Sequence, residues 1–335
     1  MVYSFQLWKH PNIRYRDALL RLSRCELLCM LRTLSIETDL QLEELGSAPF
    51  FTFSCRELSE YELTYLAGHS CVTFLTEKHG NMLHPLPVSS GDLFPPDLPE
   101  IMKYKGKTNP SFTRMMLNAG LALTSFSHQE AVTVLDPLCG RGTTLFAALC
   151  MGVDAVGIDT DRRDLKEASD YFSRYLKSSG WKHSSRDFSS TVSGVPVPGL
   201  SYEFARDKAA WQSGDTHKLT FHQGDTSLAF PLMRKSPAHL LVTDLPYGIQ
   251  HAPQGGASPE SFPGFLRRVL PSWRKALRPG AAAVISFNAL TLKASALREA
   301  LTSAGFQVAE DPVFSNLSHT VEQAVVRDLV FAFVP

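Results

Sequence analysis

Apolar residues recur at helical and strand spacings in two regions of the chain, which a proline-rich segment separates. In residues 84–100 prolines, serines and a glycine interrupt every periodic pattern, and such sequence supports neither a helix interior nor a central strand. We therefore predict a linker there and a small α+β domain before it, in residues 1–83. The predicted elements of that domain are helices at Arg16–Leu34 and Ser59–Ala67 and strands at Phe50–Ser54 and Cys71–Leu75.

Helical and strand patterns alternate through residues 101–335, which is typical of a mostly parallel sheet with helices on both faces. This predicts an α/β, Rossmann-like domain. Residues 178–215 are rich in serine and glycine and show little periodicity, so we expect an insertion loop or a partly disordered segment. The predicted strands are Ala131–Leu135, Ala155–Ile158, His239–Thr243, Ala282–Phe287 and Asp328–Val334; the predicted helices are Phe112–Phe126, Thr144–Met151, Asp164–Lys177, Phe262–Leu277 and Lys293–Ala304.

A glycine-rich turn, Asp136–Thr143, follows the first strand of this domain and leads into a helix. Gly140 and Gly142 let the backbone pass close to a ligand, and the amides at a helix N-terminus can bind a carboxylate or phosphate. Asp159 ends the next strand, where a carboxylate can accept hydrogen bonds from both hydroxyls of a ribose. Strand, turn, helix and acid together predict a site for a nucleoside-containing cofactor.

The turn also indicates which nucleoside is bound. A dinucleotide dehydrogenase has a third glycine where this chain has Leu145, and Asp136 with Pro137 would repel a pyrophosphate. The Asp136 carboxylate suits the ammonium of an amino acid instead. A later short strand ends in Asp225, which can accept a hydrogen bond from an adenine amino group. S-adenosylmethionine fits these features better than NAD.

Asp244-Leu245-Pro246-Tyr247 follows the hydrophobic strand His239–Thr243, which we expect to lie beside the first strand, where ligands bind. An exocyclic or amide nitrogen is a poor nucleophile, because its lone pair is delocalised. The Asp244 side chain and the Leu245 carbonyl can each accept an N–H and so favour a pyramidal nitrogen. Pro246 stiffens the turn and Tyr247 stacks on a planar substrate. The motif predicts nitrogen methylation.

For other polar residues near this motif and near the C-terminus we expect structural or solvent-exposed roles. Gly248–Gly264 is expected to form a mobile loop over the substrate, in which His251 is solvated. His319 and Arg327, near the last strand hairpin, are assigned surface or hairpin roles.

The composition of the chain bears on whether it binds nucleic acid, a membrane or a metal ion. The 335 residues carry a formal net charge of +0, which lacks the basic signature of a protein that binds nucleic acid by charge alone. Basic residues nevertheless gather in two places: Lys9, Arg14, Arg16, Arg21, Arg24 and Arg32, and Lys103, Lys105, Lys107 and Arg114. We find no apolar run long enough for a membrane span and no signal-peptide pattern, so a cytoplasmic protein is expected. Six scattered cysteines suggest buried thiols and no metal site.

The turn at Asp136–Thr143, the segment Gly157–Asp161 and the motif Asp244–Gly248 resemble those of the THUMP-associated RNA guanine-N2 methyltransferases, particularly the group that modifies guanosine 10 of tRNA. The resemblance covers about residues 100 to 335, including an entry helix near Thr108 that packs over the cofactor. It implies a class I, S-adenosylmethionine-dependent methyltransferase domain, an RNA substrate, and, as in some relatives, a small activator protein as partner.

Carried onto this chain, the resemblance assigns the methionine part of the cofactor to the glycine turn, the ribose to Asp159, the adenine to Asp225 and the target nitrogen to Asp244–Tyr247. The full predicted cofactor site is Thr108, Asp136, Pro137, Gly140, Gly142, Thr143, Asp159, Thr160, Asp225 and Thr226.

Three alternatives remain open from the sequence. The same Asp, Pro and aromatic arrangement would serve DNA adenine, a protein glutamine amide or a small molecule. A non-catalytic RNA-binding subunit could keep the fold, although intact Asp159 and Asp244 argue against it. A nicotinamide-dependent dehydrogenase is disfavoured by Leu145 and by the Asp244 motif.

Overall fold

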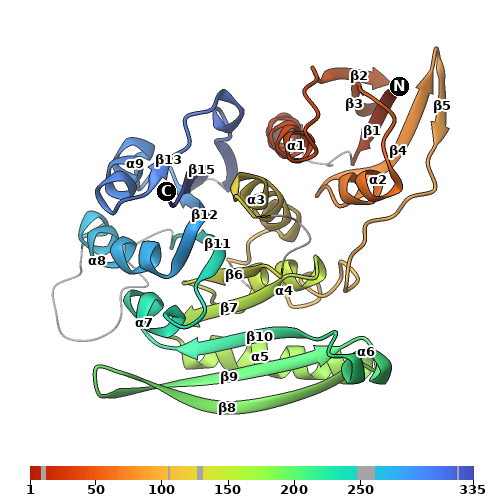
Figure 1. The fold of residues 1–335 in the computed structure, drawn as a ribbon. Helices are drawn as coiled ribbons and strands as arrows, with labels where there is room; N and C mark the ends of the chain where they lie inside the picture. The colour runs from red at the N-terminus through yellow and green to blue at the C-terminus, as the bar shows by residue number, and fades with distance from the viewer. Residues whose placement is uncertain (9–12, 105, 127–130, 247–260, 323) are drawn as a thin grey trace.

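The computed structural model describes residues 1–8, 13–104, 106–126, 131–246, 261–322 and 324–335. These residues form two β-sheets, one in the N-terminal quarter of the chain and a larger one in the rest (Figure 1). No helix in the described ranges is long and apolar enough to cross a membrane.

The N-terminal unit is an antiparallel sheet with the strand order β2-β3-β1-β4-β5. Its strands are β1 (Val2–Leu7), β2 (Gln41–Leu45), β3 (Ala48–Ser54), β4 (Val72–His79) and β5 (Met82–Pro85), and its helices are α1 (Ile13–Thr33) and α2 (Glu60–Ala67). Apolar residues of β1, β3 and β4 share one core cluster with those of the two helices. The sequence patterns predicted β3, β4, α1 and α2 but missed β1, β2 and β5. β5 ends at Pro85, within the segment 84–100 for which the sequence predicts a linker.

The second sheet has the order β13-β15-β12-β11-β6-β7-β10-β9-β8, with β14 paired to β15. Its parallel centre consists of β6 (Thr133–Asp136), β7 (Asp154–Asp159), β10 (His217–Gln223), β11 (Ala238–Asp244) and β12 (Leu277–Asn288). The antiparallel end consists of β13 (Gln307–Val308), β14 (His319–Glu322) and β15 (Val325–Phe333). The strand order reverses between β6 and β11, which pair as the sequence predicted. Ligands bind at such a reversal in open α/β sheets.

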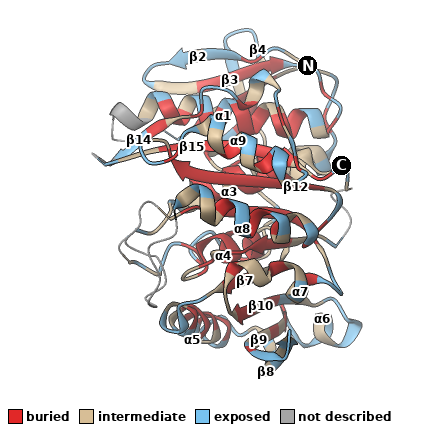
Figure 2. Ribbon diagram, turned by 90° about the vertical axis from the view of Figure 1, so that its left-hand side faces the viewer, coloured by how far each residue is buried: buried red, intermediate tan, exposed pale blue. Residues whose placement is uncertain are grey.

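Helices cover both faces of the second sheet, as expected for a Rossmann-like fold (Figure 2). One face packs against α3 (Pro110–Leu123), α4 (Thr143–Cys150) and α5 (Arg162–Ser178). The other face packs against α7 (Ala229–Met233), α8 (Phe262–Lys275) and α9 (Ala294–Ser303). Strands in the middle of the sheet are buried on both sides, which explains their continuous apolar sequence.

Residues 178–215 do not form the loop that their composition predicted. They contain a long antiparallel hairpin of β8 (Lys182–Val192) and β9 (Val195–Ala205), which extends the sheet beyond β10, and the short helix α6 (Lys208–Ser213). Ser193 and Gly194 make the two-residue turn, both at positive φ, as hairpin turns require. Most of β8 is exposed, so its serines face solvent and leave little hydrophobic alternation to detect.

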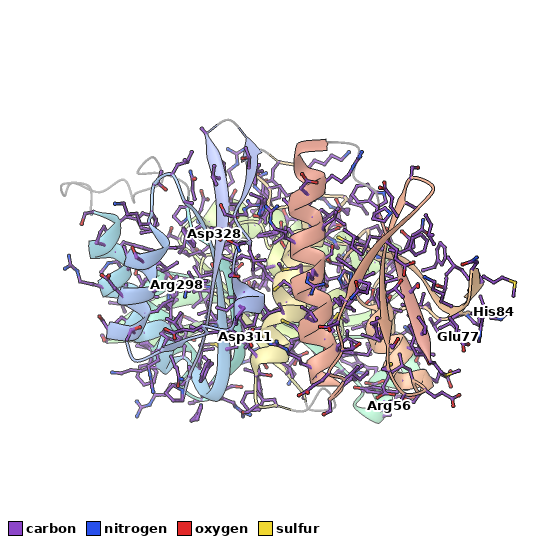
Figure 3. All side chains as sticks on the ribbon, turned by 90° about the horizontal axis from the view of Figure 1, so that it is seen from above. Arg56, Glu77, His84, Arg298, Asp311 and Asp328 are labelled. Atoms are coloured by element: carbon purple, nitrogen blue, oxygen red, sulfur yellow. The ribbon has the colours of Figure 1, made fainter. Side chains whose placement is uncertain are left out.

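The two units share a continuous interface, because α1 packs along α3 and its Leu22, Cys25 and Cys29 belong to the core of the second sheet. Three arginines of α1, which belong to the first of the two basic clusters in the sequence, form contacts within the protein. Arg21 and Arg24 donate to backbone carbonyls, and Arg32 pairs with Asp311, 2.7 Å away, on the side of the second unit that faces α1 (Figure 3).

A fully buried carboxylate, Glu26 of α1, lies at the centre of this interface. It accepts hydrogen bonds from the Asn118 side-chain amide at 2.6 Å and from the Ser70 backbone amide at 2.7 Å, and also from the Ser70 hydroxyl. His69 lies beside it, with Nε2 3.3 Å from the carboxylate. Asn118 belongs to α3 and Ser70 to the N-terminal unit, so one side chain ties the two units together.

Replacing Glu26 with alanine is therefore expected to lower the free energy of unfolding by about 3 kcal/mol, because buried donors of Asn118 and Ser70 lose their acceptor. Urea unfolding followed by fluorescence would measure the loss. Glu37→Ala, which removes an exposed glutamate shortly after the same helix, is the matched control and should change stability by less than about 0.5 kcal/mol. Equal stability of the two variants would contradict this role.

Candidate active site

The glycine turn after β6 has the backbone shape that a close ligand approach requires. Gly140 and Gly142 adopt φ values of 47° and 83°, where a β-carbon would be strained. Gly142 is the N-cap of α4 and makes no side-chain capping hydrogen bond, so the first amides of α4 point toward the turn without a capping side chain. A β-carbon placed on Gly140 would meet no described atom within 4 Å, so the space beside the turn is open.

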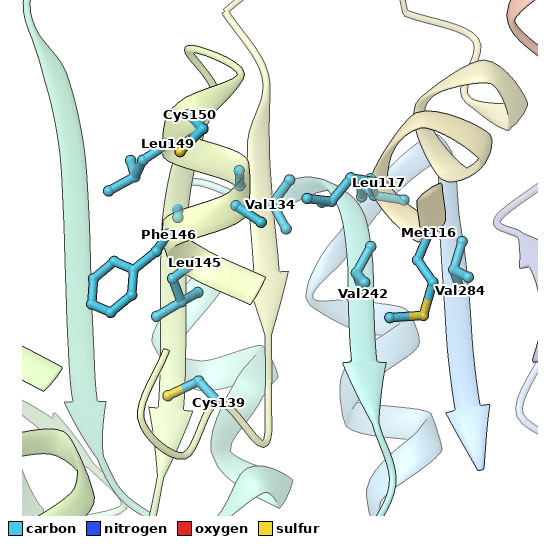
Figure 4. Packing of buried hydrophobic residues seen from close by; sticks show 14 of the residues in the cluster. Met116, Leu117, Val134, Cys139, Leu145, Phe146, Leu149, Cys150, Val242 and Val284 are labelled. Atoms are coloured by element: carbon cyan, nitrogen blue, oxygen red, sulfur yellow. The ribbon is translucent and has the colours of Figure 1, made fainter. Parts of the chain in front are cut away.

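Close packing beneath the turn fixes its position. A β-carbon on Gly157 of β7 would lie 2.5 Å from the Leu145 side chain and 2.6 Å from the Cys139 sulfur. Both side chains come from the turn and the first residues of α4 (Figure 4). The absence of a side chain at Gly157 therefore lets the turn settle directly on β7.

Asp159 at the end of β7 holds the turn from the other side. Its carboxylate accepts a hydrogen bond from the Gly140 amide at 2.8 Å and another from the Asp161 amide at 2.9 Å. Partial burial raises the pKa of Asp159, and these backbone hydrogen bonds oppose the rise. The predicted ribose ligand thus lies directly against the predicted methionine turn, while Thr160, the next residue, is exposed.

Asp136 is buried at the end of β6, with 3% of its surface exposed. Its Oδ1 accepts hydrogen bonds from the Thr243 hydroxyl at 2.8 Å and the Leu138 amide at 3.1 Å. Burial raises the pKa of Asp136 to about 6, although hydrogen bonds from threonine hydroxyls lower it. Thr243 precedes Asp244, so one hydrogen bond joins the predicted cofactor end to the predicted acceptor end.

Asp225 follows β10 and begins the 3-10 helix η1 (Thr226–Leu228), where it accepts the Ser227 amide at 2.8 Å. It also pairs with Arg268 of α8 at 2.7 Å. Burial would raise the pKa of Asp225, but hydrogen bonds from Ser227 and the Arg268 charge lower it overall. The Thr226 hydroxyl accepts the Trp273 indole N–H at 2.9 Å inside the protein. The structure thus turns the Thr226 side chain toward α8.

Asp244 ends β11 and receives hydrogen bonds from three separate parts of the chain. Its Oδ1 accepts the Ser286 hydroxyl of β12 at 2.8 Å, and its Oδ2 accepts the Thr108 hydroxyl at 2.7 Å. Arg327 of β15 donates to the same Oδ2 at 3.0 Å. Thr108, assigned to the cofactor from the sequence, therefore contacts the acceptor end of the site. Tyr104 nearby bonds the Thr143 hydroxyl at 2.7 Å, which brings the same segment against the glycine turn.

His319 and Arg327 face each other in the β14–β15 hairpin, as the hairpin alternative expected, but they are buried, so the surface alternative is wrong. Each has 4% of its surface exposed. The Arg327 guanidinium carbon lies 4.9 Å from the centre of the Phe112 ring, and the His319 ring meets Phe112 edge-on at 5.2 Å. Burial lowers the pKa of His319 to about 4, which keeps it neutral near pH 7. A period-two reading of β15 places Arg327 on the same face as Leu329 and Phe331, which are buried, and could have found it.

The rest of the predicted acceptor motif is described only in part. The Leu245 amide donates to the Ser286 carbonyl at 2.8 Å and its side chain is buried, so the backbone stays bonded to β12 directly after β11 ends at Asp244. Pro246 is partly exposed. Tyr247, His251 and the rest of the predicted loop up to residue 260 lie outside the described residues.

Comparison with known proteins finds likeness in fold. No protein-family model and no curated protein matches the sequence. The structure is similar to TrmN from Thermus thermophilus, with 14% identity over 100% of both chains and a TM-score of 0.47. It is also similar to a TehB-like SAM-dependent methyltransferase from Corynebacterium glutamicum (14% identity, 62% of this chain and 83% of that one, TM-score 0.36) and to the pre-rRNA processing protein fibrillarin of Methanococcus jannaschii (11% identity, 88% and 98%, TM-score 0.37). At these identities the likeness concerns the fold alone.

Proposed function

We propose that this chain is an S-adenosylmethionine-dependent N-methyltransferase that modifies a planar, neutral nitrogen. The observation that carries the proposal is the junction of β6 and β11. There an open glycine turn, with Asp136 and Asp159 beside it, lies next to an oriented carboxylate, Asp244, and the Thr243–Asp136 hydrogen bond joins the two ends. Such a junction suits the transfer of a group from a bound nucleoside to an acceptor.

The described residues fit the donor. Space is open beside Gly140, the amides of α4 lack a capping side chain, and carboxylates stand at the ends of β6, β7 and β10. Asp136 would hold the ammonium of the methionine part, Asp159 the ribose hydroxyls and Asp225 the adenine amino group. When bound, S-adenosylmethionine supplies a methyl group from its sulfonium and leaves as a neutral thioether.

The acceptor end supports a neutral nitrogen. Asp244 would accept an N–H of the acceptor, which draws the nitrogen toward the pyramidal shape it needs as a nucleophile, and can take the proton that the methylated nitrogen gives up. The buried Arg327 charge lies 3.0 Å from this carboxylate. An ammonium has no lone pair with which to attack the methyl group, whereas an aromatic amine or an amide is uncharged near pH 7 and can donate an N–H to Asp244.

For the acceptor molecule we propose an RNA base, with guanine N2 of tRNA as the first choice, and a cytoplasmic location. The support is the likeness of the motifs at Asp136–Thr143, Gly157–Asp161 and Asp244–Gly248 to those of the guanine-N2 methyltransferases. The proposal includes an activator protein only as a partner to be tested. Protein amides, DNA adenine and small molecules are the alternatives that the test must separate.

The test is transfer of labelled methyl from S-adenosylmethionine to separate fractions of total tRNA, DNA and protein, with and without cell extract as a source of activator. Label in tRNA that digests to N2-methylguanosine is the expected result. Calorimetry with S-adenosylmethionine and with NAD runs alongside, and binding of NAD alone would overturn the donor assignment. Label in protein or DNA would support N-methylation but would contradict the assignment of RNA as the substrate.

The burial of Asp136 predicts a pH dependence of donor binding. With a pKa of about 6, its carboxylate is mostly protonated at pH 5 and mostly ionised at pH 7, while an α-ammonium keeps its charge across this range. Affinity for S-adenosylmethionine should therefore rise about tenfold from pH 5 to pH 7. Calorimetry at the two pH values measures this. Asp136→Asn should bind weakly with no such rise, and a pH-independent wild type would contradict the role.

A further inference from the structure

A buried cation lies behind the proposed acceptor carboxylate. Arg327 of β15 has 4% of its side chain exposed, and its Nη2 lies 3.0 Å from Oδ2 of Asp244. A guanidinium is costly to bury unless a carboxylate compensates its charge. The pairing with Asp244 therefore accounts for the position of Arg327 inside the protein, and it also constrains Asp244.

Aromatic packing fixes the guanidinium itself. It stacks over Phe112, the third residue of α3, and the ring of His319 packs edge-on against the same phenylalanine. A planar guanidinium on an aromatic face has little freedom to rotate. Its N–H group is thus aimed at Asp244 by the aromatic packing around it.

The carboxylate plane of Asp244 is defined by donors on opposite oxygens. Ser286 bonds Oδ1, while Thr108 and Arg327 bond Oδ2. These donors come from β12, from the segment before α3 and from β15. Rotation of the carboxylate would break hydrogen bonds on both sides. A reacting group held in this way keeps the orientation that a methyl acceptor needs.

The N-terminal unit also contacts the β14–β15 hairpin, which carries Arg327. Arg21 of α1 donates from Nε to the Asn316 carbonyl at 2.9 Å and from Nη2 to the Ser318 carbonyl at 3.1 Å. Ser318 directly precedes β14, which pairs with β15 and sets Arg327 opposite His319. The hairpin that carries Arg327 is therefore held from the N-terminal side as well.

We propose that Arg327 is a positioning residue for methyl transfer, which acts by holding the Asp244 carboxylate in the orientation that receives the acceptor N–H. This inference rests on the proposed function. It assigns to Arg327 no contact with either substrate, so its loss should affect the rate of transfer more than binding.

The test compares Arg327→Met with Arg327→Lys. Methionine keeps apolar packing on Phe112 without the charge, and kcat should fall about 20-fold, while the KM for the acceptor and the Kd for the donor stay within about threefold. Lysine restores the charge without the planar fork, so kcat should recover to within about fivefold of wild type. A crystal structure of Arg327→Met without donor should show the Asp244 carboxylate in more than one orientation.

Arg114→Met is the matched control. Arg114 forms a partly buried ion pair with Asp92 at 2.7 Å and makes no described contact with Asp244, so its loss should lower thermal stability and leave kcat unchanged. The inference is overturned if Arg327→Met keeps the wild-type kcat, if Asp244 keeps one orientation in that variant, or if Arg114→Met loses as much rate. A wild-type protein that transfers no methyl at all would instead overturn the proposed function, while the crystal structure would still decide whether Arg327 orients Asp244.

Discussion

Replacement of Asp244 with alanine is expected to lower the rate of methyl transfer at least about 1000-fold, while the Kd for S-adenosylmethionine changes less than about threefold. Asp244 is the proposed acceptor of the substrate N–H, and the donor-binding carboxylates, Asp136 and Asp159, stay in place. Single-turnover transfer with saturating labelled donor measures the rate, and calorimetry measures the affinity.

A loss of folding could imitate this result, because Asp244→Ala leaves the Arg327 charge buried without its partner at a cost of about 3–5 kcal/mol. The double variant Asp244→Ala/Arg327→Met removes both charges and should regain stability. It should remain inactive, whereas Arg327→Met alone keeps measurable transfer. A double variant as active as Arg327→Met would remove Asp244 from the mechanism.

The elements around Asp244 show what a sequence can reveal about such a site. β11 was predictable because a strand buried on both faces is apolar throughout, and the acidic motif that ends it stands out. Thr108 lies 136 residues away from Asp244 in the sequence. No local sequence pattern can reveal that the Thr108 hydroxyl and the Asp244 carboxylate are in contact. Their contact depends on how the segment before α3 crosses the ends of the strands, which only the assembled fold defines.

The other differences arise from how polar residues were interpreted. For Arg327 the position near the last hairpin left surface and hairpin roles open, although its register with the buried Leu329 and Phe331 points inward. The composition of the β8–β9 hairpin resembles that of a loop, because an outer strand exposes most of its side chains and needs few apolar ones. β1 alternates, with Tyr3, Phe5 and Leu7 in the core, so its pattern was present in the sequence. For β1 and for Arg327, the alternation of buried and exposed positions along the strand is therefore the more informative feature of the sequence.

Replacement of Asp159 with alanine should raise the Kd for S-adenosylmethionine about 100-fold, because two hydrogen bonds from ribose hydroxyls to a charged acceptor are lost. The same change removes the acceptor of the Gly140 and Asp161 amides, so the glycine turn also loses its support from β7. Because Asp244 is untouched, the rate at saturating donor should stay within about threefold of wild type. Calorimetry and single-turnover rates over a range of donor concentrations separate the two effects.

Asp161→Ala is the matched control for this prediction. Asp161 caps α5 by accepting the Arg163 and Asp164 amides, so its loss should cost about 1 kcal/mol of stability without weakening donor binding. Asp159→Asn keeps the shape of the side chain but offers one acceptor atom where the Gly140 and Asp161 amides need two, so its Kd should lie between those of wild type and Asp159→Ala. If Asp159→Ala instead bound the donor as tightly as Asp161→Ala, the ribose would have to be held by another residue, and the donor site would need to be placed elsewhere along the β6–β11 junction.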